Sequence, residues 1–161
     1  MRLDDNQSLE VGCSVARAMR ALGERWSILI IREAFYGITH FDDFERKLGV
    51  ATNVLSARLK TLVEFGLMER KVGLAGKRRT YHLTEKGKAF FPVYVALKSW
   101  ADAWQPGGGD PAMRLCDAKT GEEIQVAPLV RSDGSKIVSD DLVIQPRRQL
   151  QNVPGARKSG F

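Results

Sequence analysis

Apolar residues recur at helical spacing through the first part of the chain and predict four helices in succession. The predicted helices cover residues 13–22, 25–36, 39–48 and 52–65. A glycine follows each helix, and Gly23 is suited to end the first one in a left-handed turn. The isoleucine-rich centre of 25–36 is compatible with a strand, but its length and its apolar residues on every side favour a buried central helix.

The third and fourth predicted helices have the pattern of a helix-turn-helix. Thr39 is a capping residue with an acid three positions on, and a tight turn at 49–51 leads into the fourth helix. That helix has a leucine stripe, and its other azimuths carry Asn53, Ser56, Arg58, Lys60 and Thr61. A polar and basic helix of this kind fits the DNA major groove, about 12 Å wide. The alternative interpretation is an ordinary helical hairpin with a solvated face.

Two predicted strands, 67–72 and 79–83, follow the helix-turn-helix and enclose a glycine-bracketed basic loop. This arrangement is typical of a wing. Lys77, Arg78 and Arg79 lie at its tip, where they can reach a phosphate or enter a minor groove.

A long helix is predicted from the capping residue Thr84 to about Trp104, with Pro92 able to kink it. It is apolar on two faces, one with Phe90 and Tyr94 and the other with Val93 and Trp100. Because one subunit rarely buries both faces, a second copy of the chain is the expected partner for one of them.

The last third of the chain begins after a glycine run at 107–109. Three short strands, 113–117, 123–130 and 136–144, predict a small antiparallel β-meander. We therefore expect a mainly α, α+β fold in three parts: a winged helix-turn-helix with a long dimerisation helix at 1–106, a β appendage at 107–145, and a basic, disordered tail at 146–161.

The distribution of charge changes this picture more than its total. The net charge is +6, and residues 58–88 alone hold nine basic and three acidic side chains, so the whole excess lies there. A basic patch confined to one supersecondary unit is expected of a surface that meets nucleic-acid phosphates. A solvated charged face is the alternative interpretation.

Other chemistry is weakly represented. Cys13 and Cys116 belong to no C-x-x-C pair, so neither zinc nor a disulfide is indicated. The two histidines, His40 and His82, have no nucleophile and carboxylate around them in a recognisable pattern, and we expect no enzyme activity, metal or cofactor. Without an apolar run of bilayer length or a secretion signal, the expected location is the cytoplasm, away from membranes.

Several spaced motifs in order resemble the HxlR family of dimeric winged-helix regulators, which is related to the MarR group. They are Cys13, then 23–33 (GERWSILIIRE), 55–59 (LSARL) and 81–87 (YHLTEKG). The resemblance covers about Cys13 to Trp104. It implies that residues 52–65 are the recognition helix, 73–79 the wing, and the terminal helices the dimer contacts.

The resemblance also bears on two single residues. Some family members sense electrophiles or oxidants through a cysteine near the start of the first helix, and Cys13 matches it; a plain packing role is the alternative. Its place near a helix N-terminus, one turn before Arg17, favours a thiolate. The departure is Ala51, where the family usually has a capping Ser or Thr; Thr52 is the substitute cap.

These observations predict a sequence-specific DNA-binding transcriptional regulator acting as a homodimer on a pseudo-palindromic operator. The resemblance implies repression or activation of a nearby operon; a repressor is the expected kind, and an activator is the alternative. Its two recognition helices would enter major grooves about 34 Å apart. The expected DNA-binding residues are Thr52, Asn53, Ser56, Arg58, Lys60, Lys77, Arg78 and Arg79. Of these, Asn53 and Ser56 are expected to contact bases. A small-molecule effector stays open, since Trp26, Trp100 and Trp104 suit either a ligand cavity or a core. The alternative function is a winged-helix protein-interaction module without a DNA target.

Overall fold

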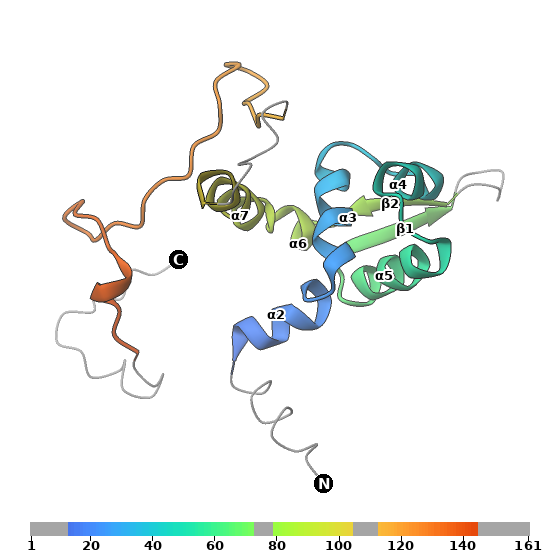
Figure 1. Cartoon of the computed structure of the whole chain (residues 1–161), viewed down its shortest axis with the longest axis horizontal. Helices are drawn as coiled ribbons and strands as arrows, with labels where there is room; N and C mark the ends of the chain where they lie inside the picture. Colours follow the sequence, from blue (N-terminus) through green and yellow to red (C-terminus); the bar gives the residue numbers. More distant parts are fainter. Residues whose placement is uncertain (1–12, 73–78, 105–112, 145–161) are drawn as a thin grey trace, which may run out of the picture. The chain divides into compact units, whose positions relative to one another are not determined.

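The computed structural model describes residues 13–72, 79–104 and 113–144. It divides into two compact units, Met1–Leu115 and Cys116–Phe161, which are described separately below. Within the described residues, every α-helix and the single two-stranded sheet lie in the first unit (Figure 1). None of these described helices is both long and apolar enough to cross a membrane.

Helices α2 (Ser14–Leu22) and α3 (Arg25–Phe35) open the first unit. α3 is the predicted central helix, with Ile30 and Ile31 completely buried. Gly23, between the two helices, has a right-handed φ of −67°, so the predicted left-handed turn is wrong. A Cβ at Gly23 would lie 2.6 Å from the carbonyl oxygen of Met19, and glycine is needed there for that close approach.

The predicted helix-turn-helix is confirmed by α4 (Phe41–Leu48) and α5 (Thr52–Glu64). Gly49 ends α4 in the left-handed region, at φ 61°, which turns the chain toward α5. The predicted caps are wrong by one residue at each helix. His40 occupies the N-cap of α4 and Ala51 that of α5, and neither makes a side-chain cap hydrogen bond. Thr52, the first helical residue of α5, instead donates its hydroxyl hydrogen to the Glu45 carboxylate.

Strands β1 (Met68–Val72) and β2 (Arg79–Leu83) form the predicted antiparallel hairpin, with Arg70 opposite Tyr81. The segment before α4 adds a further contact to this hairpin. The backbone N–H of Tyr81 donates to the Thr39 carbonyl at 2.7 Å, and His40 forms an isolated bridge with Thr80. The hairpin is therefore fixed to the helix-turn-helix through its second strand.

One hydrophobic core joins these elements. α5 contributes its leucine stripe to it, and α4 and the hairpin cover its edges. Its fully buried apolar residues are Ile30, Ile31, Phe44, Leu55, Leu59, Leu62 and Met68. The predicted leucine stripe of α5 is thus confirmed, and the winged helix-turn-helix fold with it.

The long helix predicted from Thr84 to Trp104 is two helices, α6 (Glu85–Lys88) and α7 (Phe91–Trp104). Thr84 caps α6 as predicted, accepting a hydrogen bond from the Gly87 N–H at 3.1 Å. The break falls just before Pro92, which has no N–H to continue the helix and whose ring would clash with the carbonyl four residues earlier. Pro92 is accommodated in the first turn of α7, where that N–H is not needed.

The predicted β-meander of the second unit is wrong. Over the described residues 113–144, the chain forms isolated bridges, Cys116 with Glu123 and Val130 with Lys136, and one short 3-10 helix, η1 (Ser139–Asp141). The apolar side chains here are largely exposed, so no buried face holds strands together. Short turns remain, and backbone N–H groups of Thr120 and Lys119 lower the pKa of Asp117. The predicted tail at 146–161 and the glycine run at 107–109 lie outside the described residues.

Candidate nucleic-acid interface

An open groove of about 1220 Å³ lies between α4, α5 and the hairpin. Ser56 and Lys60 of α5 line one part of it, and Arg70 and Arg79 of the hairpin line another. Its apolar lining comes from Phe41, Val63, Met68 and Tyr81. Helix α5 and the hairpin therefore face one hollow from two sides.

The N-terminal half of α5 presents the predicted base-reading residues. Thr52, Asn53 and Ser56 are all exposed, and Ser56 lines the groove. Lys60, one turn after Ser56, is 3.7 Å from the Glu64 carboxylate and also lines the groove. Hydroxyl and amide groups on an exposed helix face are suited to bond base edges in a major groove.

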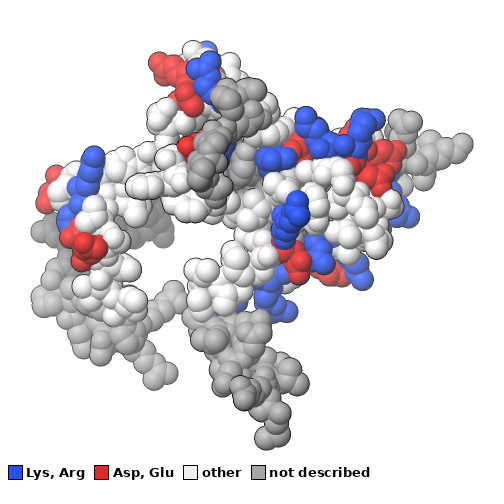
Figure 2. Space-filling view, viewed as in Figure 1, with Lys and Arg blue, Asp and Glu red and all other residues white. Residues whose placement is uncertain are grey.

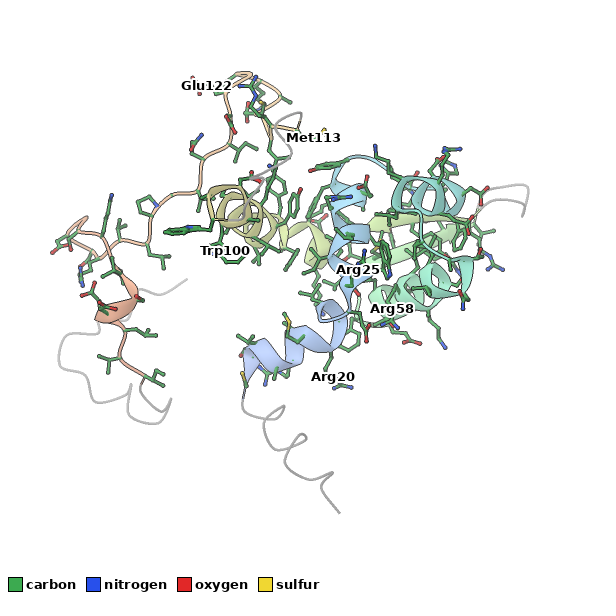
Figure 3. The ribbon with its side chains drawn as sticks, in the orientation of Figure 1. Arg20, Arg25, Arg58, Trp100, Met113 and Glu122 are labelled. Carbon is green, nitrogen blue, oxygen red and sulfur yellow. The ribbon has the colours of Figure 1, made fainter. Side chains whose placement is uncertain are left out.

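Arg58 takes a different position from the other predicted residues. Its side chain is only 27% exposed, and its guanidinium lies 3.6 Å from the Glu24 carboxylate at the start of α3 (Figure 3). It is absent from the lining of the groove described above. Arg58 therefore links α5 to α3 in this structure, away from Lys60.

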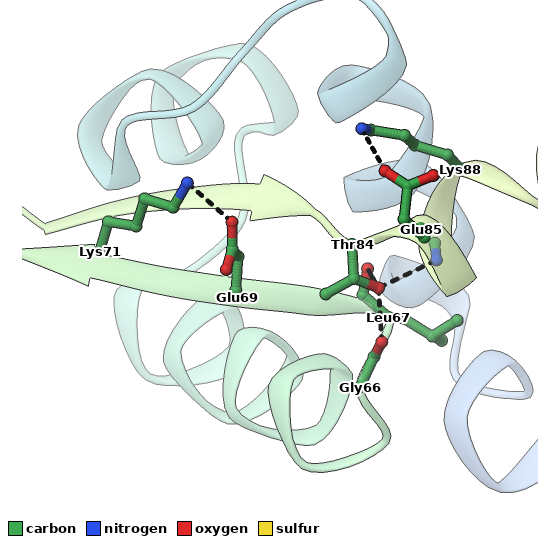
Figure 4. Close-up of polar contacts among 8 residues, drawn as sticks. Gly66, Leu67, Glu69, Lys71, Thr84, Glu85 and Lys88 are labelled. Carbon is green, nitrogen blue, oxygen red and sulfur yellow. Dashed lines mark hydrogen bonds and ion pairs between the residues drawn. The ribbon is translucent and has the colours of Figure 1, made fainter.

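The hairpin divides its charges between two faces. Arg70 and Arg79 share the face of Tyr81, because side chains two apart on a strand point the same way and Arg70 pairs with Tyr81 across it. Lys71 points to the opposite face, where its ammonium lies 2.8 Å from the Glu69 carboxylate (Figure 4). The hydrogen bond from Lys71 lowers the pKa of Glu69. Lys77 and Arg78 lie outside the described residues.

Two groove residues, Arg46 and Arg70, were missed by the sequence reasoning as site residues. Strand alternation from the buried Tyr81 would have placed Arg70 on the groove face. Arg46 of α4 reaches the groove beside Asp43, with which it forms an ion pair. No local pattern indicates that position, because it depends on how α4 packs against the hairpin.

The groove carries both signs of charge. Its basic lining residues are Arg46, Lys60, Arg70 and Arg79, and its acidic lining includes Asp42, Asp43 and Glu64. Lys and Arg lie beside Asp and Glu on the face that Figure 2 shows. Among residues 58–88, the bases that the structure describes therefore do not gather on one side: Arg58 and Lys71 point elsewhere, and Lys88 pairs with Glu85.

An apolar stripe lies exposed along α7. Val93, Leu97, Trp100 and Trp104 follow one another at helical spacing, and each is at least 40% exposed. The opposite side of α7 packs inward through Tyr94 and Val95. Large apolar groups in one exposed row indicate a surface that another molecule covers.

Cys13 and the histidines complete the candidate residues. Cys13 is exposed at the N-cap of α2, with the Ala16 N–H directed at its sulfur at 3.4 Å. Arg17, one turn later, donates to the Ser14 hydroxyl at 3.1 Å. The Nδ1 atom of His40 lies 3.8 Å from Asp43, and His82 contacts the Thr80 hydroxyl, both on or beside the hairpin. In the described part of the chain, no three His, Cys, Asp or Glu side chains are grouped to hold a metal ion.

Comparisons with known proteins agree with this geometry. Residues 21–108 match the family model described as an HxlR-like helix-turn-helix. The chain is 36% identical over 136 residues to MT3179 of Mycobacterium tuberculosis (strain CDC 1551 / Oshkosh), named an HTH-type transcriptional regulator, and this covers 84% of the chain and 86% of the relative.

Solved structures extend the similarity to the fold. The crystal structure of PA1607 superposes with a TM-score of 0.78 at 34% identity, covering 86% of this chain and 98% of that one. The reduced form of the transcriptional regulator YodB from Bacillus subtilis gives a TM-score of 0.53 at 31% identity, covering 60% and 97%. A winged helix-turn-helix with these relatives is a DNA-binding transcription regulator of the MarR-like kind. The chain therefore belongs to the HxlR-like helix-turn-helix family of transcriptional regulators, which are not enzymes.

Proposed function

We propose that the chain binds a pseudo-palindromic operator as a homodimer and represses transcription from the adjoining promoter. The groove between α5 and the hairpin is the observation that carries this proposal, because it places Ser56 and Lys60 opposite Arg70 and Arg79. A phosphate backbone in the groove would meet cationic groups from both sides. Repression needs no further surface, since a bound dimer excludes other proteins from the same DNA.

In this proposal the recognition helix reads sequence and the hairpin holds the backbone. Thr52, Asn53 and Ser56 contact bases, while Lys60, Arg70 and Arg79 contact phosphates. Lys77 and Arg78, at the predicted tip of the wing, are proposed to add phosphate contacts. Arg58 acts indirectly, by holding α5 against Glu24.

The homodimer is proposed from the exposed stripe of α7. A symmetric dimer would cover Val93, Leu97 and Trp100 of both copies with the same patch of the partner. Two copies related by a twofold axis would also present two copies of α5, which is what a palindromic site requires.

The decisive experiment is selection of bound duplexes from a random pool, followed by titration of the selected duplex at two salt concentrations. We expect inverted half-sites about one helical turn apart and binding that weakens steeply with salt. Because the groove carries both acidic and basic residues, the competing function, a protein-interaction module, must be tested as well. If no duplex is enriched and binding is absent even at low salt, the chain is a protein-interaction module instead.

We further propose that Cys13 lets electrophiles or oxidants release the DNA. Its thiol is exposed at the start of α2, where a reagent can reach it. The relative YodB has been solved with a quinone bound, at 32% identity and a TM-score of 0.50. Treatment with a quinone should release operator from the wild-type protein but not from Cys13→Ser, with Cys116→Ser as the matched control. Equal release from wild type and Cys13→Ser would contradict this role.

A further inference from the structure

The C-terminal end of the recognition helix meets the start of α6 at the base of the hairpin. Residues 65–67 end α5 and lead into β1, and residues 84–87 leave β2 and form α6. Within this contact, here called the α5–α6 junction, three residues of the second segment each make a different link to the first. Figure 4 draws the link made by Thr84.

Thr84 makes the first link. Its hydroxyl donates to the Gly66 carbonyl at 2.6 Å and accepts from the Gly87 N–H at 3.1 Å. Its backbone N–H donates to the Leu67 carbonyl at 3.1 Å. One side chain therefore satisfies an N–H at the start of α6 and a carbonyl just beyond the end of α5.

Lys86 makes the second link, by donating from its ammonium to the Phe65 carbonyl at 2.6 Å. Phe65 is the C-cap of α5, and the last turn of α5 has no basic residue of its own. The carbonyl end of a helix attracts positive charge. Lys86 supplies from α6 the cation that the sequence of α5 lacks.

Gly87 makes the third link through close approach. It is buried, and a Cβ at this position would overlap the Leu67 carbonyl oxygen. The Leu83 side chain would be 3.1 Å from the same Cβ. Any larger residue must push α6 away from the end of α5.

Helix α7 begins three residues after α6 ends, so the junction sits between the recognition helix and the apolar stripe. The N-terminal half of α7 is itself held on α3 by Phe35, Tyr36 and Tyr94. The direction of α5 is thereby tied to that of α7. In a dimer joined through α7, this angle sets the distance between the two copies of α5.

We infer that Thr84, Lys86 and Gly87 are positioning residues that fix the half-site spacing of the operator. The inference rests on the proposed function, since it requires a dimer that reads DNA. None of the three residues needs to touch DNA for this role. Their effect is on where α5 is held.

The test compares selected duplex pools for wild type, Thr84→Val and Lys86→Met. Thr84→Val keeps the shape of the side chain but removes the hydroxyl and with it the hydrogen bonds to the Gly66 and Leu67 carbonyls and from the Gly87 N–H. Lys86→Met keeps the apolar stem without the ammonium. Lys88→Met is the matched control, because the Lys88 ammonium pairs with Glu85 and, unlike that of Lys86, is not hydrogen-bonded to the Phe65 carbonyl. Circular dichroism identifies the variants that fold. Thr84→Ser keeps the hydroxyl and should therefore select the same half-site spacing as wild type.

Lys86→Met, which loses one hydrogen bond, should bind the wild-type operator about tenfold more weakly, and Thr84→Val, which loses more than one, should bind it at least about tenfold more weakly. Their own selected pools should spread over several half-site spacings, while nonspecific duplex binds as before. Lys88→Met should keep the single wild-type spacing. A purely structural role would lower stability without changing the preferred spacing.

Two results would overturn the inference alone. One is a single, unchanged spacing for folded Thr84→Val and Lys86→Met. The other is that Lys86→Met weakens binding to all duplexes equally and lowers the slope of log binding constant against log salt by about one. That result would mark Lys86 as a phosphate contact. If wild type itself enriches no duplex, the proposed function fails first and this inference falls with it.

Discussion

The hydroxyl oxygens of Tyr36 and Tyr94 lie 2.6 Å apart and join α3 directly to α7. The ring of Phe35 stacks on that of Tyr94, with centroids 5.7 Å apart, and meets Phe91 edge to face at 5.1 Å. α7 is therefore attached to the central helix by an aromatic cluster with one partly buried hydrogen bond. This attachment allows the angle between α7 and α5, the proposed DNA-reading helix, to be fixed.

The tyrosine pair predicts a stability change at alkaline pH. Burial first, and then the hydrogen bond with Tyr36, raise the pKa of Tyr94 above its ordinary 10.0. A group whose pKa is raised on folding contributes stability that is complete below its unfolded pKa and is lost as pH rises beyond it. The unfolding free energy should therefore fall more steeply above about pH 10 in wild type than in Tyr94→Phe. Urea unfolding at several pH values measures both slopes.

Tyr36→Phe is the control for that experiment. It removes the hydrogen bond but leaves Tyr94 buried, so its slope should lie between those of wild type and Tyr94→Phe. Near pH 7 each single substitution should cost about 0.5–1.5 kcal/mol, and the double substitution less than the sum. Identical alkaline slopes for wild type and Tyr94→Phe would show that Tyr94 ionises freely.

The two faces of the hairpin predict different effects for neighbouring bases. Arg70→Gln removes a groove cation, whereas Lys71→Gln removes one on the opposite face that pairs with Glu69. The slope of log binding constant against log salt should fall by about one for Arg70→Gln and stay unchanged for Lys71→Gln. Fluorescence anisotropy with labelled duplex at four salt concentrations measures it. Equal slopes for the two variants would remove the hairpin from the interface.

The helices could be predicted from the sequence because their burial follows local periodicity. The leucine stripe at 55, 59 and 62 places α5 correctly, and Gly49 marks the turn before it. Arg58 shows where this reasoning ends. Helical periodicity places Arg58 beside the leucine stripe of α5. It does not identify the ion-pair partner Glu24, which the packing of α5 on α3 brings near. Charge counts along the chain do not contain that information.

Two predictions were wrong: the single long helix at 84–104 and the β-meander at 113–144. The periodicity of 84–104 is continuous, but one backbone N–H missing at Pro92 outweighs it and divides the helix. In 113–144, alternation and turn residues are present, and the turns at Gly121 and Gly134 do form with positive φ. Strands need a buried face as well, and Leu129 and Leu142 remain 75% and 70% exposed there.

The proposed base contacts of Asn53 and Ser56 predict that removing either side chain relaxes sequence specificity at one base position. Asn53→Ala and Ser56→Ala remove exposed polar groups from α5 without touching its buried stripe. Each should cost about 1–3 kcal/mol on the operator and relax the preference at one base position in each half-site. Selection from a pool randomised at single positions reveals which one. Thr61→Ala is the control, because the Thr61 hydroxyl is engaged with the Ala57 carbonyl of its own helix. A uniform loss at all positions would indicate backbone contacts instead.

The exposed stripe of α7 predicts that a single charge prevents dimerisation. Leu97 lies at the centre of the stripe, and full burial of a leucine contributes about 1.5–3 kcal/mol. In a twofold dimer, Leu97→Arg places the substitution twice in one interface, so the dissociation constant should rise at least about a hundredfold. Sedimentation at micromolar concentration should then find monomers. Ser99→Arg introduces the same charge at an exposed position outside the stripe and should leave the dimer intact. If both variants sediment as wild type does, α7 lies outside the dimer interface, and the spacing argument for the α5–α6 junction loses its basis.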